Sequence, residues 1–169
     1  MSHWMVRLLK HRRLDAADAE RLLGSGALER LQARVAASEA AHSGEIRLCV
    51  EAGLPLSYLR RGASARERAV AMFGKLRVWD TAHNNGVLIY LLLAEHAIEI
   101  VADRGLSARV DADEWQRIAQ TMQAAFKSGQ FETGLNQAID AVGAFLAAHF
   151  ALAPGEANPN ELPDAPYLR

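Results

Sequence analysis

Two acidic residues and an amide flank a pair of apolar segments, in positions where oxygen atoms can hold a metal ion. Asp80 and Asn85 precede the apolar run 87–93, and Asp103 follows the shorter run 97–101. Only three residues join the two runs, which predicts an antiparallel hairpin, so that the start of one strand lies beside the end of the other. Carboxylate and amide oxygens are ligands that Ca²⁺ and Mg²⁺ take in proteins. The sequence therefore predicts a divalent-cation site formed by Asp80, Asn85 and Asp103.

The same residues have a simpler interpretation as turn residues. Asp and Asn are frequent in loops because their side chains bond to nearby backbone groups. Asn84, Asn85 and Gly86 together have the composition of a plain turn. Both interpretations stay open at the level of sequence.

Arg104 and His83 extend the candidate site toward phosphoester chemistry. Beside a cation that polarises a phosphoryl oxygen and activates water, Arg104 would hold the phosphate and His83 would donate a proton. The alternatives are a surface ion pair for Arg104 and an exposed loop position for His83. No nucleophile with a positioned base is recognisable, and Cys49, the single cysteine, stands in a strand-like pattern without a catalytic motif around it.

Composition excludes several classes of protein. The chain has 169 residues and a net charge of −1, which suits one globular domain and does not favour a nucleic-acid partner. It contains no run of about 18 apolar residues that would cross a membrane, and one cysteine excludes a disulfide framework. The absence of CxxC and HExxH patterns argues against zinc. Because the basic residues near the N terminus follow or interrupt the apolar ones, they do not form a signal peptide, and we expect a cytoplasmic protein.

Hydrophobic periodicity predicts helices on both sides of a small sheet. Ile46, Leu48 and Val50 alternate with polar residues, which predicts a half-buried strand with Cys49 on its more polar side, whereas the run 87–93 is apolar throughout and predicts a central strand covered on both faces. Helical spacing of apolar residues begins near Asp15, Leu28, Ser64, Asp111 and Phe131. The predicted fold class is therefore α/β (α+β), a three-layer α/β/α sandwich around a small mixed sheet that contains one antiparallel hairpin.

The chain divides into three parts on the same evidence. Residues 1–26 form a basic N-terminal segment with a short helix, and residues 27–152 form the domain. Residues 153–169 are rich in proline, and we expect this tail to be disordered.

Several short motifs, taken in order, resemble the TPM domain family, which includes thylakoid-lumen, photosystem-associated and nematode receptor-associated proteins. The matching segments are 44–47 (GEIR), 85–89 (NGVLI), 103–106 (DRGL) and 126–129 (FKSG), and the similarity covers roughly residues 27–150. The chain is most similar to a small soluble bacterial branch of that family. The resemblance implies an α/β/α sandwich, a divalent ion in a cleft at the end of the sheet for some members, and acid phosphatase activity for plant members.

Together these observations predict a TPM-like module that binds or assists the assembly of a protein partner, with Ca²⁺ or Mg²⁺ at the end of its sheet. One alternative is a metal-assisted acid phosphatase acting on phosphoesters, and another is an oligomeric scaffold. We expect a monomer or weak oligomer with no nucleic-acid partner and no integral membrane segment.

Overall fold

The protein is built on a four-stranded mixed sheet with the strand order β3-β2-β1-β4. The computed structural model describes residues 3–169, so Met1 and Ser2 of the basic N-terminal segment lie outside it. The strands are β1 (Glu45–Glu51), β2 (Gly86–Leu92), β3 (Ala97–Ala102) and β4 (Tyr167–Leu168). β1 runs parallel to β2 and to β4, and β2 pairs antiparallel with β3. The predicted hairpin and mixed sheet are therefore confirmed.

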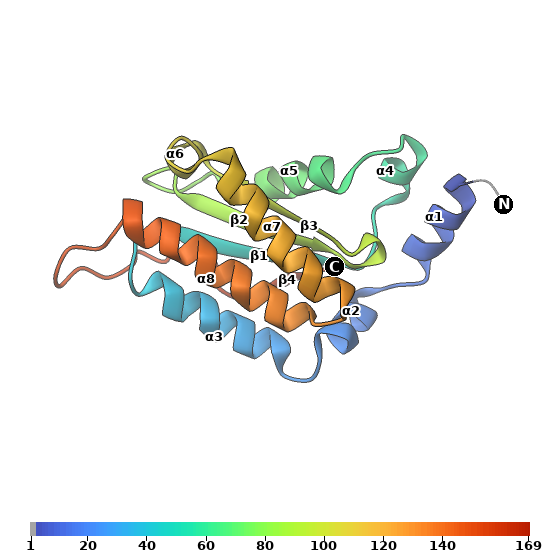
Figure 1. The fold of residues 1–169 in the computed structure, drawn as a ribbon, viewed down its shortest axis with the longest axis horizontal. Helices are drawn as coiled ribbons and strands as arrows, with labels where there is room; N and C mark the ends of the chain where they lie inside the picture. Colours follow the sequence, from blue (N-terminus) through green and yellow to red (C-terminus); the bar gives the residue numbers. More distant parts are fainter. Residues whose placement is uncertain (1–2) are drawn as a thin grey trace.

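Helices cover both faces of the sheet, as Figure 1 shows. They are α1 (His3–Arg12), α2 (Ala16–Leu23), α3 (Ala27–Glu39), α4 (Leu56–Arg60), α5 (Ala65–Lys75), α6 (Arg104–Ser107), α7 (Ala112–Lys127) and α8 (Phe131–His149), with a 3-10 turn, η1 (Leu93–Glu95), between β2 and β3. Residues of α2, α3, α7 and α8 pack on one face, and residues of α4 and α5 pack on the other. Within residues 3–169, no helix is long and apolar enough to cross a membrane.

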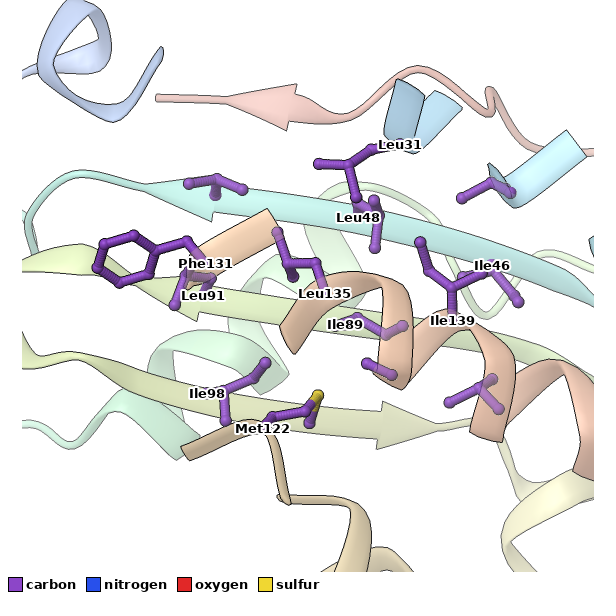
Figure 2. Packing of buried hydrophobic residues seen from close by; sticks show 14 of the residues in the cluster. Leu31, Ile46, Leu48, Ile89, Leu91, Ile98, Met122, Phe131, Leu135 and Ile139 are labelled. Carbon is purple, nitrogen blue, oxygen red and sulfur yellow. The ribbon is translucent and has the colours of Figure 1, made fainter. Parts of the chain in front are cut away.

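The core has two halves, one on each face of β2. Val87, Ile89 and Leu91 contribute to the half beneath α3 and α8, and the intervening Leu88 and Tyr90 contribute to the half beneath α5. Figure 2 shows Ile89 and Leu91 facing Leu135 and Ile139 of α8. Burial of one such side chain contributes about 1.5–3 kcal/mol. This double coverage explains why β2 is apolar without alternation.

Capping residues set the starts of two helices. Asp15 accepts from the backbone amide of Asp18 over 2.9 Å, and Asp18 accepts from that of Asp15, so α2 begins with a reciprocal capping box. Ser64 accepts from the amide of Glu67 over 3.1 Å at the start of α5. The carboxylate of Glu67 pairs with Arg61 instead of returning to the Ser64 amide, so α5 has the serine cap without the reciprocal bond.

Strand β1 is more deeply buried than its alternating pattern predicted. All seven of its residues are buried, including Glu45, Arg47, Cys49 and Glu51. Burial raises the pKa of the Cys49 thiol to about 12, so Cys49 is a packing residue rather than a nucleophile.

The C-terminal segment covers the outer edge of β1, where disorder had been expected. The guanidinium of Arg47 donates to the backbone carbonyls of Pro163, over 2.7 Å, and Ala165. Further along, β4 pairs with β1 at Cys49 and Val50. Proline suits such an edge because it accepts hydrogen bonds without offering an amide. The buried guanidinium of Arg47 requires hydrogen-bond acceptors, and the tail supplies them and is thereby ordered. These contacts connect residues that are far apart in the sequence.

Candidate functional site

A pocket of about 480 Å³ lies at the end of the sheet where β2 begins and β3 ends. Its lining is mostly polar and comes from the loop before β2 and the turn after β3: Trp79, Asp80, Thr81, Ala82, Asn84, Asp103 and Arg104. Of the five site residues predicted from the sequence, Asp80, Asp103 and Arg104 line this pocket. Asn85 and His83 do not.

The hairpin and two close backbone approaches bring the pocket walls together. The β2–β3 ladder continues past the strands, because the amide of Asp103 donates to the carbonyl of Gly86 over 2.9 Å. The amide of Gly105 donates to the carbonyl of Asn84 over 2.9 Å, which ties the turn after β3 to the loop before β2. A Cβ on Gly86 would lie 2.0 Å from the carbonyl oxygen of Val78, so that loop returns directly over the first residue of β2. Asp80, two residues after Val78, is thereby carried to the same rim as Asp103.

Asp103 has one carboxylate oxygen bonded and one without a partner. It is the N-cap of α6, and its Oδ1 accepts from the amide of Arg104 over 2.7 Å. Its Oδ2 is shielded from solvent and has no hydrogen-bond partner in the described chain. A buried carboxylate oxygen without a partner is costly and is uncommon in folded proteins. Among the residues that line the pocket, Asp103 is therefore the one whose carboxylate most needs a positive ligand.

Asp80 and Arg104 lie in more polar surroundings. The exposed carboxylate of Asp80 pairs with Arg77 three residues earlier. Arg104 is also exposed, and its Nε and Nη2 donate to Oδ1 of Asn84 over 3.2 and 3.0 Å. The pocket thus offers two carboxylates and a guanidinium on neighbouring segments.

Asn84, rather than Asn85, supplies the amide that lines the pocket. Asn84 has a left-handed backbone with φ of 52°. Asn85 is fully buried: its backbone amide donates to Oγ1 of Thr81 over 3.1 Å, and its Nδ2 donates to Oγ of Ser43 over 3.3 Å. The signal for Asn84 in the sequence is weak, namely the tolerance of Asn for positive φ in a turn.

The donor chemistry suits a hard cation with few protein ligands. Nowhere in residues 3–169 do three or more His, Cys, Asp or Glu side chains converge as they would around a tightly held metal ion. Two carboxylates together with amide, hydroxyl and water oxygens fit Ca²⁺ or Mg²⁺ better than zinc, which prefers nitrogen and sulfur. Such a sparse set of ligands corresponds to weak binding.

A second polar cluster, which the sequence pattern does not predict, lies on the α5 face of the sheet. Arg68 donates to both carboxylate oxygens of Glu51 over 2.7 and 2.5 Å, and the Tyr90 hydroxyl donates to Glu51 over 2.7 Å. The hydrogen bond with Glu51 raises the pKa of Arg68, and burial raises the pKa of Tyr90. All three residues are buried, so this cluster holds α5 to the sheet.

The fold and sequence are similar to those of proteins already described. A structure of the BA42 protein from the psychrophilic bacterium Bizionia argentinensis matches with a TM-score of 0.73 and 27% identity, over 85% of this chain and 92% of that one. The N-terminal domain of a protein from P. gingivalis matches with a TM-score of 0.62 and 20% identity, over 78% and 83% of the two chains, and shows a common fold. No curated protein matches the sequence. The family model described as the TPM domain matches residues 16–145. The chain therefore belongs to the TPM domain family.

Proposed function

We propose that this protein is a TPM-domain module that binds a divalent cation, Ca²⁺ or Mg²⁺, between Asp80 and Asp103. The observation that supports the proposal most strongly is Asp103, which lines the same pocket as Asp80 and whose solvent-shielded Oδ2 has no hydrogen-bond partner in the described chain. Asn84 offers an amide oxygen beside them, although Arg104 holds that oxygen in the present arrangement. Asn85 acts behind the pocket by bonding to Thr81 and Ser43.

Thermal unfolding with and without the cation tests the proposal. At a cation concentration about ten times Kd, a ligand that binds only the folded state adds about 1.4 kcal/mol of stability. We expect Ca²⁺ or Mg²⁺ to raise the melting temperature, while NaCl at equal ionic strength leaves it unchanged.

The variant Asp103→Asn isolates the charge of the candidate ligand. Asn is as good an N-cap as Asp, so α6 keeps its first hydrogen bond while the carboxylate is removed. Asp111→Asn is the matched control, because Asp111 is an exposed N-cap, of α7, outside the pocket. The proposal requires Asp103→Asn to lose the cation-dependent shift and Asp111→Asn to keep it. An equal shift in both variants would place the bound cation elsewhere.

A second candidate function is metal-assisted hydrolysis of phosphoesters, favoured by the guanidinium of Arg104 in the same pocket. The bound cation would supply Lewis acidity toward a phosphoryl oxygen. Arg104 would release Asn84 and bind the remaining phosphate oxygens, and His83, in the adjoining loop, would have to turn toward the pocket to donate a proton.

Turnover of p-nitrophenyl phosphate with Mg²⁺ distinguishes this candidate from a binding module. If the protein is such an enzyme, Asp103→Asn and Arg104→Gln abolish turnover, and His83→Gln lowers it. Cation binding without turnover supports the binding module, whose expected ligand is a protein partner. Light scattering tests the scaffold alternative, since a scaffold stays oligomeric when it is diluted.

A further inference from the structure

A second pocket, of about 350 Å³, lies at the opposite end of the sheet from Asp80 and Asp103. β2 begins at the first site with Gly86 and ends at Leu92, directly before the η1 turn that lines this second pocket. Lys10 of α1, His96 after η1, and Gln123 and Lys127 near the end of α7 complete its polar lining. In Figure 1, α6 lies at the end of the molecule that carries Asp80 and Asp103, and α1 lies at the opposite end, where this second pocket is found.

The charge of this pocket is positive and largely uncompensated. Its carboxylate, Glu95, already accepts from Nε of Arg7 over 2.7 Å and contacts Nε2 of His11 at 2.9 Å. Lys10 and Lys127 form no ion pair with any carboxylate in the described part of the chain. The chain has three lysines, and two of them line this one pocket.

The Glu95 contacts fix one wall of the pocket. Nδ1 of His11 accepts from the amide of Leu54 over 2.9 Å, so the proton of the neutral ring is on Nε2, which donates to Glu95. His11 is 4% exposed and anchors α1, the helix that carries Lys10. The negative charge of Glu95 is therefore used to hold α1 in place and does not neutralise the two lysines.

His96 is held at the rim by its backbone and its ring. Its φ is 48°, a left-handed conformation that few residues other than glycine adopt. Its ring meets that of Phe131 edge-on, with 5.7 Å between centroids. Leu14, Leu93 and Ala94 add an apolar part to the lining. The pocket thus combines two ammonium groups, an exposed imidazole and apolar surface.

We infer that this pocket binds the phosphate group of a small molecule, through the ammonium groups of Lys10 and Lys127. Two positive charges match a phosphate dianion better than a carboxylate, and lysine is a common phosphate ligand. The volume is in the range of small-molecule sites, and the apolar lining can receive an organic substituent. This inference is independent of cation binding at the other end of the sheet.

Amide chemical shifts of the full chain, titrated separately with inorganic phosphate, phenyl phosphate and chloride at matched ionic strength, test the inference. We expect saturable shifts at Glu95, His96 and Lys127 with both phosphates and none with chloride. Tighter binding of phenyl phosphate identifies a phosphoester as the ligand, and equal binding identifies the free ion. Shifts that chloride reproduces would overturn the inference, because they would report charge screening alone.

Lysine variants separate binding from a merely structural role. We expect Lys10→Gln and Lys127→Gln each to weaken binding about two- to fivefold, the range for exposed charge contacts, and their combination to weaken it about tenfold. Lys75→Gln, at an exposed position on α5, is the control and leaves binding unchanged. The charge-preserving pair Lys10→Arg and Lys127→Arg keeps binding. Variants that change the melting temperature but not phosphate binding would overturn the inference, as would an equal loss in Lys75→Gln.

Discussion

The carboxylate of Glu39 accepts a hydrogen bond from the backbone amide of Ile46 over 2.7 Å, at the edge of β1 that faces the C-terminal segment. Glu39 is only 3% exposed, and the carboxylates of Glu45 and Asp164 lie nearby. Burial raises the pKa of Glu39 to about 8, against the opposing effect of the Ile46 amide. The end of α3 is thus joined to the sheet by a group that holds its proton near neutral pH.

This burial predicts that stability falls as pH rises toward 8. The folded state binds the proton of Glu39 more tightly than the unfolded state, whose carboxyl titrates near pH 4.5. The contribution of this group is therefore complete below about pH 4.5 and is lost, by up to about 1.4 kcal/mol per pH unit, as pH rises to about 8. Glu39→Gln keeps an acceptor for Ile46 and should flatten this slope in urea unfolding across that range.

Glu29→Gln is the control for the pH prediction, because Glu29 is exposed in the first turn of the same helix. His42 has a pKa lowered by burial, so its own effect is a loss of stability as pH falls through about 6.5. The difference between the Glu39→Gln and Glu29→Gln profiles removes the contribution of His42. Parallel profiles would contradict the assignment of the slope to Glu39.

The contact between Arg68 and Glu51 predicts a large effect of removing one partner. Arg68→Met leaves the buried carboxylate of Glu51 with only the Tyr90 hydroxyl and a distant Arg169, 3.7 Å away. Breaking a buried ion pair in this way costs about 3–5 kcal/mol. Arg66→Met, at an exposed position two residues earlier on α5, should cost less than about 1 kcal/mol. Urea unfolding of both variants measures these losses of stability. If the two variants lose similar amounts, the ion pair of Arg68 and Glu51 contributes no more than an exposed ion pair does.

The close approach of Val78 to Gly86 predicts that a methyl group at residue 86 disturbs the loop that carries Asp80. Gly86→Ala forces the Val78 carbonyl away and should cost about 1–3 kcal/mol. Gly74→Ala is the control, because a Cβ there meets nothing within 4 Å and lies in α5, where alanine is preferred over glycine by about 1 kcal/mol. Melting temperatures should move in opposite directions, and an unchanged melting temperature for Gly86→Ala would contradict the packing of this loop.

The sequence was sufficient to predict the hairpin and the common rim of Asp80 and Asp103. A three-residue connection between two apolar runs leaves few alternatives to antiparallel pairing, and pairing alone sets Asp103 beside the start of β2. The sequence does not predict that Asn84, rather than Asn85, lines the pocket. That difference depends on the left-handed backbone of Asn84 and on the hydrogen bonds of Asn85 to Thr81 and Ser43.

Long-range polar contacts were the other part that sequence patterns could not supply. Arg47 meets the carbonyl of Pro163 across 116 positions, and Glu51 meets Tyr90 across 39. Periodicity predicts which residues face a core, but it does not predict which charged residues inside that core find one another. For this reason β1 was expected to be half-buried and the proline-rich tail to be disordered.

The most direct test of the central claim is a Ca²⁺ and Mg²⁺ titration of the full chain followed by the amide signals of Ala82, Asn84, Asp103 and Arg104. A cation between Asp80 and Asp103 predicts saturable shifts at these amides that disappear in Asp103→Asn and persist in Asp111→Asn. Signals that stay in place, or that shift equally in both variants, would contradict a cation site at this end of the sheet.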